Sequence, residues 1–385
     1  MTRRTVRQVL GAMKELVILR AQGVPFPPLA PRLGAEGLYI GASNSAGQGW
    51  AWARALERAL PAMRAVSSRF EHERQTSAFS FDVDLPVSYR YAAHSASWQR
   101  QQFSALSSYR AIMIESGDPI LARLFGGDTA AQARALRQVG PLTSLLFHGS
   151  DIRDPDRHLE LEPHSHFAVD PGFTETLREL TARNQRLIAT LDAPVFVSTP
   201  DLLDEVPEAA WLPVVVDVAR WERAEPPLNH DGPVRVAHVP SSSLVKGTEL
   251  IAPLLDEMAA AGAIQYTAIQ GIPHSAMPEV YGEADVVVDQ FRVGNYGVAA
   301  CEALAAGRIV VSHVSDRVRE HTRELTGEEL PVVEATPETL QQVLRDIAEH
   351  PARYLEVAAR GPAFVREHHD GRRSGRVLAE WLETA

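Results

Sequence analysis

The amino-acid sequence predicts an α/β protein built from two doubly wound domains. Its length is the first observation, because 385 residues exceed what one hydrophobic core usually organises. The second is that apolar stretches typical of buried strands alternate with helical patterns through both halves of the chain. The third is a proline-rich break at residues 211–233. We therefore expect two Rossmann-like domains that face each other across a cleft.

The first segment, residues 1–36, combines a helical pattern with a proline-rich connector. Apolar side chains recur at helical spacing between Thr5 and Arg20, and the cations around them face a single acid, Glu15. Two interpretations stay open: a helix docked on its own domain, or an interfacial helix through which residues 1–20 contact an anionic membrane.

Residues 37–215 are expected to form the N-terminal domain. Gly37–Gly41 is typical of a first strand, and a polar loop at 42–49 leads from it to a helix predicted over 50–66. The remaining elements expected in this domain are strands at 111–114, 143–147 and 194–198 and a long polar helix at 174–191.

Residues 216–360 are expected to form the C-terminal domain, and residues 361–385 a closing helix. Strands are predicted at 234–239, 266–269, 286–289, 309–312 and 331–333, and helices are predicted to start near Gly247, Ser275, Val298 and Pro337. This alternation favours a second parallel sheet.

Composition narrows the classes of function. The net charge of −11 argues against nucleic acid as a partner. The single cysteine, Cys301, cannot form a disulfide within the chain, and without a secretory signal peptide we expect a cytoplasmic protein. No run approaches the roughly 20 apolar residues that span a bilayer.

The most informative segment is a strand, a glycine turn and a helix between residues 284 and 307. The strand ends before Asp289, the turn contains Gly294 and Gly297, and the helix is predicted to run from Val298 to Gly307. Unpaired amides and the helix dipole make such a turn suited to phosphate. Glu302, more than one turn into the helix, is placed to accept hydrogen bonds from ribose hydroxyls. Phosphate and ribose together indicate a nucleotide.

A second polar turn lies one strand–helix unit earlier. A strand at 234–239 leads through Ser241, Ser242 and Ser243 to Lys246 and Gly247 at a helix start. The lysine charge could oppose the negative charge that grows on a leaving diphosphate, and the serines could donate hydroxyl hydrogen bonds.

These two turns resemble the donor site of retaining glycosyltransferases with the GT-B fold, most nearly glycosyltransferase family 4. The family pattern is Glu-x-Phe-Gly, four residues and Glu, and the run from Asn295 through Tyr296 and Gly297 to Glu302 matches its second half. The first glutamate falls on Gly294, and the arginine common before the lysine falls on Pro240. The resemblance implies donor contacts from the serines, Lys246, residues 294–297 and Glu302.

The resemblance extends to the N-terminal domain. His148 ends an apolar strand, where the family places a histidine against the donor, so we expect it to be catalytic together with Lys246. The loop containing Gly41, Asn44 and Gly47 is similar to the family loop between donor and acceptor. Its partial dinucleotide fingerprint lacks a third glycine, where Trp52 stands, which disfavours a nicotinamide enzyme. The segment after residue 361 is expected to cross back to the first domain.

The segment from 158 to 166 contains residue types that can ligate zinc. On a strand, the alternating residues His158, Glu160, Glu162, His164 and His166 would share one face, but Pro163 argues against a strand. No paired aspartates precede the phosphate turn. We therefore expect a solvated segment there, no metal, and no cofactor besides the nucleotide-diphosphate sugar as co-substrate.

The sequence thus predicts a retaining, metal-independent glycosyltransferase that moves a sugar to an acceptor hydroxyl. The acceptor could be a glycan, a lipid-linked molecule or a small molecule, and the enzyme could lie at the inner face of a membrane. Two alternatives remain: a nucleotide-sugar 2-epimerase of the same fold, and a non-catalytic nucleotide-sugar-binding partner subunit, for which the loss of the glutamate at Gly294 is the best argument.

Overall fold

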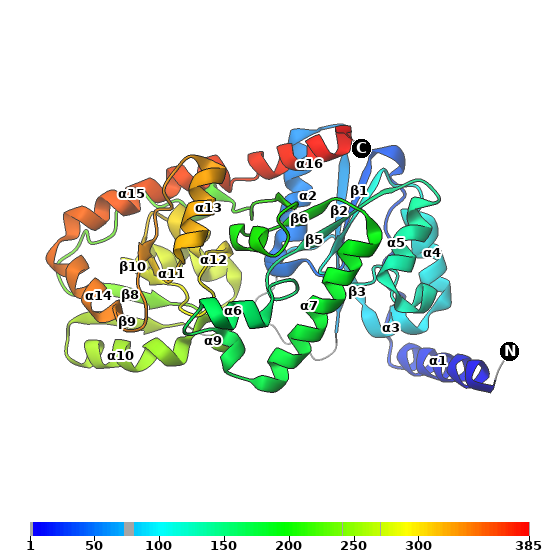
Figure 1. The fold of residues 1–385 in the computed structure, drawn as a ribbon, viewed down its shortest axis with the longest axis horizontal. Coiled ribbons are helices and arrows are strands. Elements are labelled where there is room, and N and C mark those ends of the chain that lie inside the picture. The colour runs from blue at the N-terminus through cyan, green and yellow to red at the C-terminus, as the bar shows by residue number, and fades with distance from the viewer. Residues whose placement is uncertain (1–2, 73–80, 241, 270, 385) are drawn as a thin grey trace.

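The computed structural model describes residues 3–72, 81–240, 242–269 and 271–384. The chain folds into two lobes, each built around a parallel sheet with helices on its faces (Figure 1). Within these described ranges, the N-terminal sheet has seven strands in the order β3-β2-β1-β4-β5-β6-β7, and the C-terminal sheet has five in the order β12-β11-β10-β8-β9. This arrangement confirms the predicted fold class of two doubly wound α/β domains.

The N-terminal lobe contains the following elements. Its strands are β1 (Gly37–Gly41), β2 (Arg64–Glu71), β3 (Leu85–Ser88), β4 (Ala111–Glu115), β5 (Leu142–Phe147), β6 (Val195–Val197) and β7 (Ala210–Trp211). Its helices are α1 (Arg3–Ala21), α2 (Gln48–Ala59), α3 (Tyr89–His94), α4 (Ala96–Leu106), α5 (Thr129–Arg137), α6 (Pro155–Leu161) and α7 (Pro171–Leu191).

The C-terminal lobe is smaller. Its strands are β8 (Val234–His238), β9 (Ile264–Ala268), β10 (Val286–Val288), β11 (Ile309–Ser312) and β12 (Val333–Glu334). Its helices are α8 (Val218–Trp221), α9 (Ser243–Lys246), α10 (Thr248–Ala260), α11 (Met277–Glu283), α12 (Val298–Ala305), α13 (Asp316–Thr326), α14 (Leu340–Glu349) and α15 (Pro351–His368), and α16 (Arg372–Thr384) follows.

The strands that flank the site are buried on both faces. Every residue of β1, β4, β10 and β11 is buried, as expected for central strands of a sheet covered by helices on both sides. Short polar caps start several helices: Asp154 and Asp170 each accept backbone hydrogen bonds and each precede a proline at the first helical position.

The helix predicted over residues 50–66 is confirmed as far as Ala59 and is wrong beyond it. Helix α2 ends at Ala59, and β2 begins at Arg64, inside the predicted helix. Pro61 explains the early end, because the residue before a proline is pushed away from helical backbone angles. The run of Ala65, Val66 and two serines then forms a buried strand that sequence periodicity alone did not separate from the helix.

The chain passes between the lobes twice, and the two passages touch. The expected linker is not exposed, because Val214 and Val216 are buried. The backbone amide of Val216 donates to the carbonyl of His369 at 2.7 Å, and Nδ1 of His369 lies 3.0 Å from the carbonyl of Val214. Beyond this point α16 packs on α2, where Gly375 fits closely against the backbone of Ala55.

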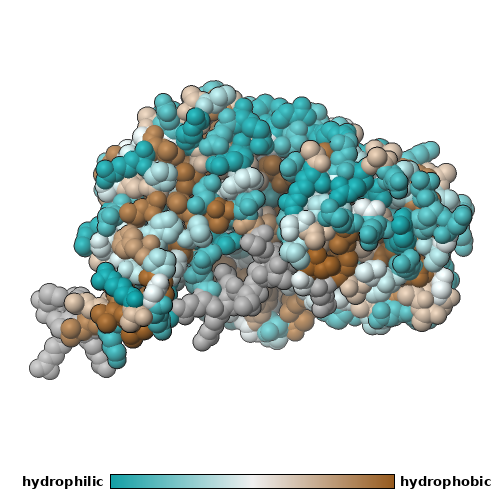
Figure 2. Space-filling model, turned by 180° about the vertical axis from the view of Figure 1, so that it is seen from behind, coloured by the Kyte–Doolittle hydropathy of each residue, from teal (hydrophilic) through white to brown (hydrophobic). Residues whose placement is uncertain are grey.

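Helix α1 projects from the N-terminal lobe, packing on α3 near its end (Figure 1). Leu19 is buried, but Leu10, Met13 and Val17 share one face and are 61%, 59% and 66% exposed. Figure 2 shows hydrophobic surface on the projecting helix, next to hydrophilic surface. Among the described helices, none has the length and hydropathy to cross a membrane.

Candidate active site

The candidate site lies between the lobes, where the carboxyl-terminal ends of strands from both sheets meet. Ligands of such sheets bind where the strand order reverses, which is between β1 and β4 in the first lobe and between β8 and β10 in the second. A pocket of about 250 Å³ occupies this place. Phe81 and His148 line it from the N-terminal lobe, and Lys246, His274 and Glu302 line it from the C-terminal lobe.

Lys246 is the last residue of α9, and its ammonium group pairs with the carboxylate of Asp289. Asp289 directly follows β10 and is buried, so this ion pair joins the two loops that flank the reversal of strand order. The side chain of Lys246 keeps 15% exposure at the pocket. An anion that binds here would therefore replace Asp289 as the partner of the ammonium group.

The glycine turn leads into α12. Gly297, Val298 and Ala299, at the start of this helix, line the pocket. First-turn amides have no partner inside their own helix, and they carry the positive end of its dipole. This helix end is therefore suited to an anionic group of a ligand.

Other residues of the turn point away from the pocket. The side-chain amide of Asn295 donates to Asp201 of the N-terminal lobe at 3.1 Å, and Tyr296 is buried in the core. Gly294 has a φ of 69°, and a side chain on it would collide with the carboxylate of Glu162. A glutamate at position 294 would therefore require the Glu162 carboxylate to move, and it would adopt a left-handed backbone conformation that favours glycine.

Glu302 reaches the pocket from α12 and accepts a hydrogen bond from Nε2 of His274 at 2.6 Å. Burial raises the pKa of Glu302 above its ordinary value, and the contact with His274 offsets part of that effect. The His274 ring packs against Phe81 of the other lobe and Trp221, with centroids 4.8 Å and 5.6 Å away. The predicted ribose-binding carboxylate is thus already engaged by a histidine that the sequence did not single out.

Two of the predicted serine donors, Ser242 and Ser243, lie apart from the pocket. Ser242 caps α9 by accepting a hydrogen bond from the amide of Val245 at 3.4 Å, and Ser243 is exposed. Neither lines the pocket. Ser241 lies outside the described residues.

His148 follows β5 and lines the pocket, as its place at a strand end predicted. Its Nε2 lies 3.2 Å from Oε1 of Glu115, and its ring stacks on Trp52 with centroids 5.6 Å apart. Burial lowers the pKa of His148, but the hydrogen bond that its ring donates to Glu115 and the negative charges of Glu115 and Asp151 outweigh burial and raise it. Sequence reasoning missed Glu115. This residue ends β4, and His148 directly follows the neighbouring strand β5.

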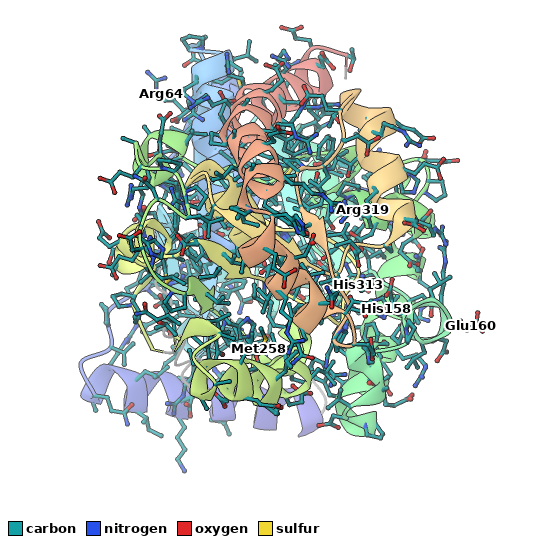
Figure 3. The ribbon with its side chains drawn as sticks, turned by 90° about the vertical axis from the view of Figure 1, so that its left-hand side faces the viewer. Arg64, His158, Glu160, Met258, His313 and Arg319 are labelled. Carbon is teal, nitrogen blue, oxygen red and sulfur yellow. The ribbon has the colours of Figure 1, made fainter. Side chains whose placement is uncertain are left out.

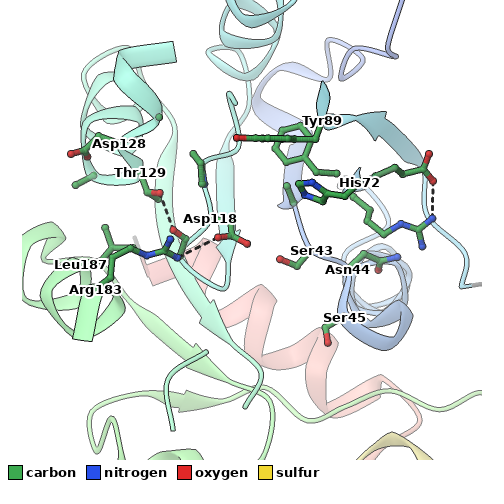
Figure 4. Close-up of a pocket in the computed structure, with 18 of the residues that line it drawn as sticks. Ser43, Asn44, Ser45, His72, Tyr89, Asp118, Asp128, Thr129, Arg183 and Leu187 are labelled. Carbon is green, nitrogen blue, oxygen red and sulfur yellow. Dashed lines mark hydrogen bonds and ion pairs between the residues drawn. The ribbon is translucent and has the colours of Figure 1, made fainter. Parts of the chain in front are cut away.

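The loop after β1 separates this pocket from a larger one within the N-terminal lobe, of about 1720 Å³ (Figure 4). Asn44 lines the larger pocket and accepts a hydrogen bond from the amide of Trp50 at 3.0 Å. Gly47 precedes α2, and Gly41 ends β1 without lining either pocket. Arg183 faces the loop from the opposite wall of the larger pocket.

The segment from 158 to 166 is neither a strand nor solvated throughout. It forms the end of α6 and a turn that contacts the C-terminal lobe, and among the described residues no cluster of metal-ligating side chains occurs. Nε2 of His158 lies 3.2 Å from the carbonyl of Val293, and Glu162 lies 2.7 Å from Nε2 of His313. Figure 3 shows His158 and His313 at this contact, with Glu160 directed outward. We call the Glu162–His313 pair the interlobe pair.

No protein-family model matches the sequence, and no curated protein matches it. Solved structures do resemble the fold at low sequence identity. Anabaena HepE in complex with UDP and glucose has a TM-score of 0.59 at 13% identity, over 91% of this chain and 99% of that one. Sucrose-phosphate synthase from Thermosynechococcus elongatus has a TM-score of 0.58 at 14% identity, over 91% and 98%.

A glycosyltransferase from Rickettsia africae is also similar, with a TM-score of 0.55 at 8% identity, over 91% of this chain and 98% of that one. These matches extend through both lobes and their connection. The chain therefore has the two-domain GT-B fold, with two Rossmann-like sheets facing across a cleft.

Proposed function

We propose that the protein is a glycosyltransferase that moves a sugar from a nucleotide-diphosphate sugar to an acceptor hydroxyl. One observation carries this proposal: Lys246, the start of α12 and Glu302 converge on one pocket between the lobes. A cation, unpaired helix amides and a carboxylate are the groups that recognise diphosphate and ribose. The HepE structures, which contain UDP with glucose or UDP-glucose, support a nucleotide sugar as the donor.

We further propose that the reaction retains the configuration at the transferred sugar and needs no metal ion. Lys246 and the first amides of α12 stabilise the negative charge of the departing diphosphate. That diphosphate can itself take the proton of the acceptor hydroxyl as the new glycosidic bond forms, so no protein base is required on this route. Glu302 then holds the ribose, and His148 orients the sugar.

For Lys246 and Glu302 to act, each must change its partner. Lys246 is paired with Asp289, and Glu302 with His274. A diphosphate can replace Asp289 at the ammonium group, and ribose hydroxyls can replace the His274 ring nitrogen at the carboxylate. Each exchange gives the pocket group a new hydrogen-bond partner. The buried carboxylate of Asp289 loses its cation, however, so diphosphate binding must offset that cost.

The test is incubation with a panel of nucleotide sugars, with and without acceptors, followed by measurement of free nucleotide diphosphate and of the anomeric configuration of the product. We expect acceptor-dependent release and a retained anomer. A 2-epimerase would instead convert the donor into its epimer, and a non-catalytic binder would bind the nucleotide sugar without turnover. An inverted anomer would contradict the proposed stereochemistry.

We also propose that α1 contacts anionic membranes, because an exposed apolar face lies beside basic side chains. Substituting Leu10, Met13 and Val17 with serine removes that face and leaves the buried Leu19 in place. We expect the triple variant to fold but to lose salt-sensitive sedimentation with anionic liposomes. A matched triple substitution of the exposed residues Val139, Leu159 and Leu161 should leave sedimentation unchanged. Liposome binding that is equal in all three proteins would assign α1 a purely structural role.

A further inference from the structure

Glu115 is buried without any exposed surface at the carboxyl-terminal end of β4. Its Oε2 accepts hydrogen bonds from the backbone amides of Ser43 at 3.1 Å and Asn44 at 2.9 Å. Its Oε1 lies 3.2 Å from Nε2 of His148. One carboxylate therefore ties the loop after β1 to the histidine after β5.

The charge of Glu115 requires a partner, because an isolated carboxylate in the interior is costly. Within the described part of the chain, His148 is the cationic side chain that pairs with it. The ionisable and charged groups around the His148 ring are Glu115 on β4 and Asp151 on its own loop, whose carboxylate accepts the His148 amide. Trp52 covers a face of the ring from α2.

The geometry leaves one ring atom of His148 for a ligand. Nε2 is held by Glu115. Nδ1 has no hydrogen-bond partner among the described residues, and it is not fully buried. His148 lines the same pocket as Lys246 and the start of α12. Its position beside Glu115 and the stacking on Trp52 fix the direction of the ring.

We propose that Glu115 is a positioning residue that holds His148 in the pocket as a cation whose Nδ1–H binds a diphosphate oxygen. The N-terminal lobe then supplies a positive donor opposite Lys246, so the diphosphate is held from both lobes. By fixing the diphosphate, His148 also orients the sugar attached to it. The binding of a diphosphate rests on the proposed function, whereas the pairing of Glu115 with His148 does not. The raised pKa of His148 agrees with a cation that persists above the ordinary histidine range.

The test is an NMR titration of the His148 imidazole, assigned through the His148→Gln variant, in the full-length chain with and without inorganic pyrophosphate. In the native protein we expect His148 to remain protonated above pH 6.5, and we expect pyrophosphate to shift its ring resonances. In Glu115→Gln, which keeps the side-chain shape, we expect the His148 titration to move down by about one pH unit or more. Asp118→Asn, three residues further along, is the matched control and should leave the His148 titration in place.

Calorimetry with pyrophosphate provides a second readout that does not depend on turnover. Glu115→Gln and His148→Gln should each weaken binding, and the double variant should weaken it no further than His148→Gln alone, because the two residues act as a unit. Should Glu115→Gln fail to fold, the loss of pyrophosphate binding in His148→Gln carries the test. An unchanged His148 titration in folded Glu115→Gln, or additive losses, would overturn the proposal. If the His148 titration depends on Glu115 but no nucleotide sugar is turned over, the pairing is supported and only the proposed function is contradicted.

Discussion

The two walls of the pocket are built in different ways. On the C-terminal wall, Lys246, Gly297 and Glu302 come from two short segments whose order along the chain already suggests a nucleotide site. On the N-terminal wall, Glu115 and His148 come from the ends of different strands and become partners only in the folded sheet. The C-terminal wall thus depends on local sequence, and the N-terminal wall on strand pairing.

The walls share one property. Each ionisable group named in the pocket has a partner: Lys246 with Asp289, Glu302 with His274, and His148 with Glu115. The difference lies in what a ligand must do. On the C-terminal wall it must displace these partners, whereas on the N-terminal wall Nδ1 of His148 is available without displacement.

The largest expected effect comes from removing the cation of the C-terminal wall. Lys246→Ala removes about 3 kcal/mol of charge stabilisation from the transition state, on the order of a hundredfold in rate. Because Asp289 would lose its partner, Lys246→Met with Asp289→Asn is the cleaner variant, and we expect the same loss. Steady-state kinetics checks this, with the exposed Arg360→Ala as control. Turnover close to that of the control would remove Lys246 from the active site.

A smaller effect is expected from Glu302→Gln, which keeps the shape of the side chain but removes its charge. A hydrogen bond to a charged group contributes about 1.5–3 kcal/mol, so nucleotide affinity should fall roughly tenfold or more. Isothermal titration calorimetry measures it, and the exposed Glu283→Gln provides the control. Unchanged affinity in Glu302→Gln would make Glu302 a structural partner of His274 only.

The contact between the lobes at the interlobe pair can be tested by varying the pH. Burial lowers the pKa of His313, but Glu162 and Glu334 outweigh burial and raise it to about 9. A raised pKa means that the interlobe pair stabilises the fold fully below the unfolded value of about 6.5 and loses this contribution as pH rises through about 9. His313→Gln should cost about 1 kcal/mol at pH 7 and nothing above pH 10.

Urea unfolding at several pH values measures the difference in free energy of unfolding between the native protein and His313→Gln. His350→Gln, which removes an exposed histidine beside Asp346, is the matched control. A difference between native protein and His313→Gln that stays constant from pH 6 to pH 10 would show that the charge of His313 plays no part.

The smallest expected effect is that of EDTA on turnover. We propose that charge stabilisation comes from Lys246 and the amides of α12, so chelation should leave the rate within experimental error. The assay compares rates after dialysis against EDTA with rates after addition of magnesium or manganese. Complete inactivation that either metal reverses would contradict a metal-independent route.

The sequence predicted what depends on local pattern. The strands at β1, β4, β5, β8 and β11 were placed within one or two residues, because buried parallel strands are short apolar runs bounded by turn residues. The helix predicted through residue 66 failed where Pro61 and a partly polar strand interrupted the pattern. Lys246 and Glu302 were found because each lies at a fixed spacing from a glycine turn, and both line the pocket.

The missed residues have no local signal. Glu115 ends an ordinary apolar strand, and only the pairing of β1, β4 and β5 brings it to His148. Glu162 was read as part of a solvated segment, because nothing in its neighbourhood shows that Gly294 leaves room for its carboxylate. Asn295 and Tyr296 were expected at the ligand, but one contacts the other lobe and the other packs in the core.

The two chain passages between the lobes have a mechanical consequence. They run side by side and are hydrogen-bonded to each other between Val216 and His369. We expect these two adjacent crossings to act as a hinge, about which the lobes rotate more readily than they slide or twist. Opening would separate Phe81 from His274 and Glu162 from His313, while α16 stays fixed to α2. The pocket would therefore open for a nucleotide sugar on the side away from the two crossings.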